Sequence, residues 1–199
     1  QGNITTGSGG LVYLIGPAVT NGGIITSPQG EVILAAGNSV ELVNPATPSL
    51  RVLITAPDNQ AVNLGSIVAD AGRVGIHAGL VRQGGTIRAN TVVRGENGEI
   101  LLKATKDVEL TAGSVTTASG PTAGKVTIEA ESGTAKVSGR IEANAEAPGA
   151  SGGTIRISAQ KDITVDAQAV ITVNGSSGGQ VAIQSVAGTT LVAGRVEAR

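Results

Sequence analysis

Aliphatic residues alternate with other residues in a short module that recurs along the chain. Most copies open on glycine, place aliphatic side chains at every second position and end on a small residue. The copies are GLVYLIG from Gly10, GEVILAA from Gly30, LRVLITA from Leu50, GRVGIHA from Gly72, GEILLKA from Gly98, GKVTIEA from Gly124, GTIRISA from Gly153 and GQVAIQS from Gly179. A short module that returns at intervals of about 20 to 30 residues is the signature of a solenoid.

The alternation predicts strands, because a period of two places successive side chains on opposite faces. In GKVTIEA we expect Val126, Ile128 and Ala130 to face a core, and Thr127 and Glu129 to face outward. The opening glycine either adopts a positive φ or permits close stacking at a corner.

Two further short strands follow each module. After GEILLKA they are predicted at 108–110 and 114–117, and after GEVILAA the second is predicted at 40–42. The third recurs as GGIIT, GSIVA, GTIRA, GRIEA and GRVEA. Three short strands per copy, joined by turns and not by helices, predict an all-β parallel β-helix of about eight coils. We interpret residues 1–199 as one repeat domain and as a fragment of a longer chain, since the pattern is already running at both ends.

Residues 44–63 interrupt the pattern. This segment holds three of the seven prolines, and the copy within it lacks the opening glycine. We predict an irregular coil or a protrusion outside the helix.

Composition narrows the function classes. The chain has no Cys, Met, Trp or Phe, and 1% of its residues are aromatic, so its core must consist of Val, Ile, Leu and Ala. Without Cys it has neither a disulfide framework nor a thiolate metal site. The net charge of −1 is spread without runs, which argues against a nucleic-acid partner. No apolar stretch is long enough to cross a bilayer, so we expect no membrane insertion.

Candidate catalytic groups are few. His77 is the only histidine and lies at an outward position, so we interpret it as a surface residue. The pairs Glu129–Glu131 and Asp162–Asp166 have the residue types that glycosidases use. Lys103 and Glu129 are expected to be stacking neighbours, which favours charge balance over catalysis. We expect no enzyme activity, cofactor or metal site, and keep a polysaccharide-acting enzyme as an alternative.

The middle outward position of the module changes along the chain. It carries large apolar residues in the early copies and Thr127, Arg156 and Ala182 in the later ones. Exposed apolar patches are normally contact sites or are covered. We therefore predict a contact or covered face whose members are Tyr13, Ile33, Leu53 and Leu101.

Three runs resemble the filamentous haemagglutinin family of two-partner-secreted exoproteins. They are GIITSPQGEVILAAGNSVELVNP at 23–45, the segment 56–89 that begins APDNQAVN, and RGENGEILLKATKDVEL at 94–110. The resemblance implies a right-handed parallel β-helix and a position just after the secretion domain. It also implies export by a dedicated outer-membrane partner transporter and a place at the surface of, or outside, a Gram-negative bacterium.

That resemblance predicts a structural function. The chain is expected to be a stalk segment of a large secreted adhesin or contact-dependent toxin-delivery protein, with a host-cell or bacterial surface receptor as a further partner. A module that binds a receptor or glycan is the other alternative. Some relatives carry an Arg-Gly-Asp cell-binding tripeptide, whereas this chain has Arg94-Gly95-Glu96, so integrin binding does not carry over.

Overall fold

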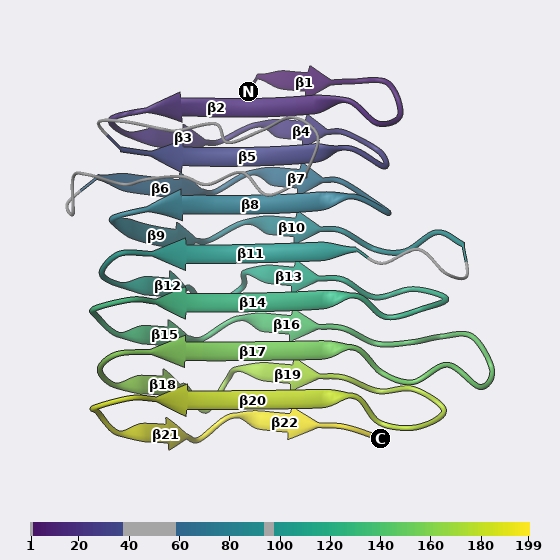
Figure 1. Cartoon of the computed structure of the whole chain (residues 1–199), viewed down its shortest axis with the longest axis vertical. Helices are drawn as coiled ribbons and strands as arrows, with labels where there is room; N and C mark the ends of the chain where they lie inside the picture. Colours follow the sequence, from purple (N-terminus) through teal and green to yellow (C-terminus); the bar gives the residue numbers. More distant parts are fainter. Residues whose placement is uncertain (1, 38–58, 94–97) are drawn as a thin grey trace.

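Three parallel sheets wind around one axis. The computed structural model describes residues 2–37, 59–93 and 98–199, and within these ranges it contains 22 strands and no helix (Figure 1). In Figure 1 the chain descends as it winds, crossing the front from right to left in the long strands and returning behind them. This is a right-handed parallel β-helix, which confirms the predicted fold class.

Each sheet contains one strand from every coil. Sheet A consists of β1 (Asn3–Thr5), β4 (Ile24–Thr26), β7 (Ser66–Val68), β10 (Thr86–Arg88), β13 (Val115–Thr117), β16 (Arg140–Glu142), β19 (Val170–Thr172) and β22 (Arg195–Glu197). Sheet B consists of β2 (Leu11–Gly16), β5 (Glu31–Ala36), β8 (Arg73–Ala78), β11 (Glu99–Ala104), β14 (Lys125–Ala130), β17 (Thr154–Ala159) and β20 (Gln180–Ser185). Sheet C consists of β3 (Val19–Asn21), β6 (Gln60–Asn63), β9 (Leu80–Gln83), β12 (Val108–Leu110), β15 (Ala135–Val137), β18 (Ile163–Val165) and β21 (Thr190–Val192).

Among the described residues sheet B has seven strands, and the sequence pattern predicts eight copies of the module. Strand β5 pairs directly with β8, with Val32 opposite Val74 and Leu34 opposite Ile76. The copy that begins at Leu50 lies outside the described residues. The opening glycines form a column along sheet B that leaves no room for a side chain. A Cβ on Gly72 would collide with the carbonyl oxygen of Gly30, and the same holds at Gly124 against Gly98.

The opening glycines therefore serve close stacking. The described glycines with positive φ are Gly9, Gly113, Gly120 and Gly149, and none of them opens a module. The alternative explanation from the sequence, a positive φ, is wrong for these positions.

The last residues of the segment 44–63, which was predicted to be irregular, form a regular strand. Gln60–Asn63 form strand β6, which pairs with β3 on one side and β9 on the other. This strand is the second strand of its coil, the place assigned from sequence to 40–42. The earlier part of the segment, like 40–42, lies outside the described residues.

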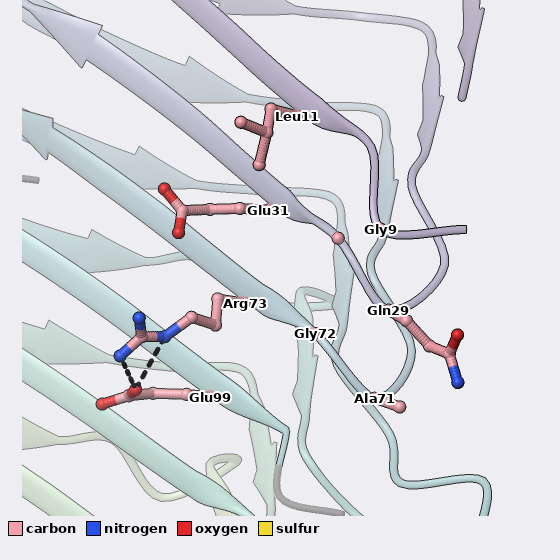
Figure 2. Close-up of a pocket in the computed structure, with 9 residues that line it drawn as sticks. Gly9, Leu11, Gln29, Glu31, Ala71, Gly72, Arg73 and Glu99 are labelled. Atoms are coloured by element: carbon pink, nitrogen blue, oxygen red, sulfur yellow. Dashed lines mark hydrogen bonds and ion pairs between the residues drawn. The ribbon is translucent and has the colours of Figure 1, made fainter. Parts of the chain in front are cut away.

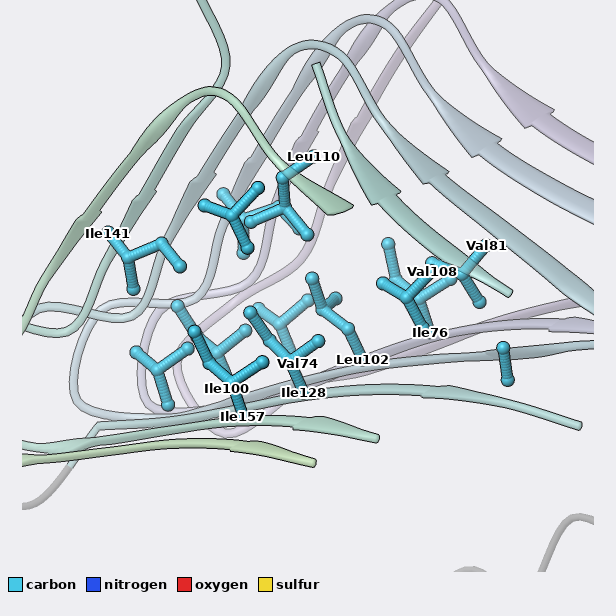
Figure 3. Close-up of a cluster of buried hydrophobic side chains, with 14 of the residues drawn as sticks. Val74, Ile76, Val81, Ile100, Leu102, Val108, Leu110, Ile128, Ile141 and Ile157 are labelled. Carbon is cyan, nitrogen blue, oxygen red and sulfur yellow. The ribbon is translucent and has the colours of Figure 1, made fainter. Parts of the chain in front are cut away.

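The core is a stack of aliphatic columns. Ile76, Leu102, Ile128 and Ile157 follow one another in register along sheet B, and each is fully buried. Figure 3 shows these side chains facing Val81, Val108 and Leu110 from sheet C and Ile141 from sheet A. The predicted facing of β14 is confirmed, since Val126, Ile128 and Ala130 are buried while Thr127 and Glu129 are partly exposed.

Candidate functional site

The outer face of sheet B carries the residues predicted as a contact or covered face. Tyr13, Ile33, Gly75, Leu101 and Thr127 form one outward column. Ile33 is 4% exposed, Tyr13 is 36% exposed and Leu101 is half-buried. Leu53 lies outside the described residues. The assignment of these four as a contact or covered face stays a prediction.

His77 lies on this outer face but is not a surface residue. Its side chain is 7% exposed, so the interpretation from sequence is wrong on exposure, although the outward position is right. A Cβ on Gly75 would lie 3.0 Å from the His77 Nε2, so the glycine makes room for the imidazole. Burial, together with the neighbouring Lys103 ammonium, lowers the pKa of His77 to about 4. The imidazole is therefore neutral at pH 7.

The Lys103 ammonium holds the carboxylates that suggested a glycosidase. Its Nζ lies 2.7 Å from Glu131 and 3.6 Å from Glu129, and Glu129 is its register neighbour as predicted. Burial disfavours the charge on Lys103, but the hydrogen bond to Glu131 and the two carboxylate charges outweigh burial and raise its pKa. The second pair has separate partners: Asp162 Oδ1 accepts the Thr189 N–H at 2.7 Å, and Asp166 lies 3.5 Å from the Lys136 Nζ.

A shallow cavity of about 420 Å³ lies at the corner between sheets A and B (Figure 2). The Arg73 guanidinium crosses its wall and donates two hydrogen bonds to Glu99 Oε2, at 2.9 and 3.2 Å. The remaining carboxylate in the lining is Glu31, which accepts a hydrogen bond from Tyr13 Oη at 3.1 Å. Burial and the Glu31 carboxylate raise the pKa of Tyr13. In the lining of this cavity Arg73 is thus paired with Glu99, and Glu31 with Tyr13.

The described ranges contain no cluster of side chains that could bind a metal ion. No group of three or more His, Asp or Glu side chains lies close enough there to hold an ion.

A ladder of amides, which the sequence analysis missed, runs inside the first three coils. Asn21 Nδ2 donates to Asn63 Oδ1, and Asn63 Nδ2 donates to Gln83 Oε1, each at 2.8 Å. Gln83 Nε2 ends the ladder on the Gly85 carbonyl at 3.0 Å. The next residues in this column are Leu110 and Val137. The sequence pattern could have predicted this ladder. It places an Asn at an inward position at the end of a short apolar strand, and a buried amide needs hydrogen-bond partners.

A second ladder links side chains to the backbone of the following coil. Asp70 Oδ1 accepts the Asn90 N–H, and Asn90 Oδ1 accepts the Ser119 N–H. The series continues through Ser119 Oγ and Asn144 Oδ1 to Asn174 Oδ1, which accepts the Arg199 N–H at 3.0 Å. The turn residue Asp107 acts in the same way towards Thr134 N–H. The polar groups of the corners thus stabilise stacking between coils.

No family model matches the chain, and no characterised protein matches its sequence. Among solved structures it is similar to the HMW1 secretion domain from Haemophilus influenzae, with a TM-score of 0.67 at 23% identity. The match covers 98% of this chain and 64% of that domain, so the chain spans just under two thirds of the structure it matches. At this identity the similarity establishes the β-helical fold. The described residues include no helix of the length and apolarity that a membrane span needs.

Proposed function

We propose that this chain is a structural β-helix of a secreted exoprotein, exported from a Gram-negative bacterium through an outer-membrane partner transporter. The observation that carries the proposal is the fold match, which extends over 98% of the chain and is to a secretion domain. The repeat runs that resemble two-partner-secreted exoproteins point the same way. The match is to a secretion domain itself, whereas the sequence resemblance placed the chain just after one.

The stalk function gains support from how the polar residues are used. The acidic pairs that an enzyme would need instead hold Lys103, Lys136 and backbone N–H groups. The ladders of Asn, Ser and Asp side chains connect coil to coil. Such a molecule is stabilised by each coil on its neighbours, and its length supplies reach. In this proposal the chain has no catalytic activity and is one segment of a larger adhesin or toxin-delivery protein.

Export is tested by a graft. The matched part of the HMW1 secretion domain is replaced by residues 1–199, and secreted protein is measured in cells that carry or lack the transporter used by HMW1. We expect secretion that depends on the transporter. A graft that folds, as judged by its β-sheet circular dichroism, but is not secreted would contradict the proposal. Release of reducing ends from polysaccharides by the purified chain would instead favour the enzyme alternative.

A further inference from the structure

The amide ladder from Asn21 to Gln83 lies on either side of the longest connection between strands. It links β3, β6 and β9, and the inward column that it fills continues in β12 with the aliphatic Leu110. Directly before β6, the connection from sheet B to sheet C covers residues 37–59. The other six connections from sheet B to sheet C contain one to four residues each. The amides thus occur where a strand takes its place after an unusually long connection.

The length of a connection decides whether it can fix the register of the next strand. One to four residues reach only one place on the neighbouring sheet, so a short connection sets the register by itself. A long connection does not, because the entropic cost of closing a loop rises only slowly with its length. Alternation decides which residues of β6 face inward, but a shift by two residues keeps that facing. Strand β6 therefore needs a further signal for its register.

The amides distinguish the native register from one that is shifted by two residues. In the native register Asn63 lies between Asn21 and Gln83 and shares a hydrogen bond of 2.8 Å with each. After a shift, Ala61 or Gly65 would take the place of Asn63, and neither has a side-chain amide. The buried amides of the two neighbouring strands would then lose their partners, which is costly inside a protein.

We propose that the amide ladder sets the register in which β6 joins the helix, with Asn63 as its positioning residue. Buried polar groups have this effect in coiled coils, where a single Asn fixes the register at a cost in stability. In the coils with short connections the same column needs no amide, and Leu110 and Val137 occupy it. The ladder thus allows the connection before β6 to be long without changing how the coils stack.

Cysteine pairs in this cysteine-free chain report the register. Val62 and Arg82 are register neighbours on the outer face of sheet C, so their Cα atoms lie about 4.8 Å apart. Gln60 and Leu64 lie two residues to either side of Val62, which places each about 8 Å from Arg82. A disulfide requires Cα atoms about 4.4–6.8 Å apart. Under mild oxidation Val62→Cys/Arg82→Cys should close a disulfide, whereas Gln60→Cys/Arg82→Cys and Leu64→Cys/Arg82→Cys should not.

The same pairs are then placed in a chain whose ladder is replaced by leucine. Asn21→Leu/Asn63→Leu/Gln83→Leu suits the column, because Leu110 is fully buried in it one coil further on. In this background we expect disulfide formation by the native pair to fall and that by at least one offset pair to rise several-fold. Alkylation of the remaining free thiols, followed by mass spectrometry, measures each yield. All three pairs share Arg82→Cys, so the loss of its ion pair with Glu109 affects them equally.

Two outcomes of that experiment would overturn the proposal. Offset pairs that stay unlinked in the leucine background would leave the register to the stacking of Gly65 on Gly23. A leucine variant without β-sheet circular dichroism would mean that the ladder is needed for folding itself, and not for the choice of register.

Thermal denaturation separates register from stability. Asn63→Leu alone leaves the amides of Asn21 and Gln83 without their shared partner, so its melting temperature should fall by on the order of 10 °C. The triple leucine variant buries no unpartnered amide and should melt higher than this single variant. A triple variant that melts lower would contradict the proposed role. The inference is independent of the proposed export, because every measurement uses the purified chain alone.

Discussion

At the scale of single residues, His77 is the clearest case of a side chain whose environment differs from its sequence context. Alternation places it outward, yet it is almost completely buried beside Gly75 and Lys103. On the other side its register neighbour is Ala35, which carries no charge. A buried imidazole beside an ammonium favours the neutral form.

His77 should make stability depend on pH. Its pKa is about 4 in the folded protein and about 6.5 in an unfolded chain, so between these values the unfolded state binds a proton that the folded state does not. Stability should therefore fall as pH drops from about 6.5 to about 4, by on the order of 2–3 kcal/mol. Urea denaturation at pH 7 and pH 4.5 measures this loss.

The variant His77→Leu supplies the control. It removes the titrating group and keeps an apolar side chain under the same cover, so its loss of stability between the two pH values should be smaller. Carboxylates also titrate in this range, so the comparison is between the two proteins. Equal losses in both would rule out His77 as the source.

At the scale of strands, the opening glycine of each module decides whether a copy can become a rung. The copies from Gly30, Gly72, Gly98, Gly124, Gly153 and Gly179 all form strands of sheet B. Glycine is needed there because backbone occupies the space of a side chain. At Gly98 this is the Ala89 carbonyl, and at the other five it is the carbonyl of the preceding opening glycine. Alternating aliphatics alone would not satisfy this requirement.

Gly124→Ala should be strongly destabilising. The new methyl group would meet the Gly98 carbonyl oxygen, so two backbones must separate and the hydrogen bond from Lys125 N–H to Gly98 O must lengthen. We expect a loss of about 2–4 kcal/mol, by the mechanism of overpacking in a filled space. Thermal denaturation followed by circular dichroism provides the measurement.

Gly7→Ala is the matched control for that change. No atom lies within 4 Å of a Cβ built on Gly7, and its φ is not in the positive range. Its melting temperature should stay close to that of the unchanged protein. If both variants melted alike, close stacking would not be the reason for the glycine column.

At the scale of the whole molecule, stability is arranged along one axis. Each strand pairs only with its equivalents in the coils before and after it. Every inner coil is therefore packed between two other coils, whereas the first and the last coil of residues 1–199 each pack on one. Solenoids of this kind are stabilised by a sum of coil and interface terms.

The same substitution should thus cost more inside than at the end. Ile128→Ala removes a fully buried side chain from an inner coil and should cost about 2–5 kcal/mol. Ile183→Ala, in the last coil, removes a side chain of the same type that is only partly buried, and should cost less than half as much. Chemical denaturation compares the two. Equal costs would contradict the dependence of each coil on its neighbours.

Much of this protein was determined by its sequence alone. The period-two aliphatic pattern, the opening glycines and the scarcity of aromatic residues predicted a parallel β-helix, and the facing of β14 and the pairing of Lys103 with Glu129 were predicted correctly. These features recur in each module, so the same local pattern predicts them several times along the chain.

The tertiary structure decided what local rules cannot report. Three such features depend on which coils become neighbours. They are the direct pairing of β5 with β8, the burial of His77 and the amide ladder from Asn21 to Gln83. Neighbours in a solenoid lie 20 or more residues apart, and 42 residues separate Asn21 from Asn63. Alternation determines which way a side chain points, but only the stacking of coils determines what lies beside it.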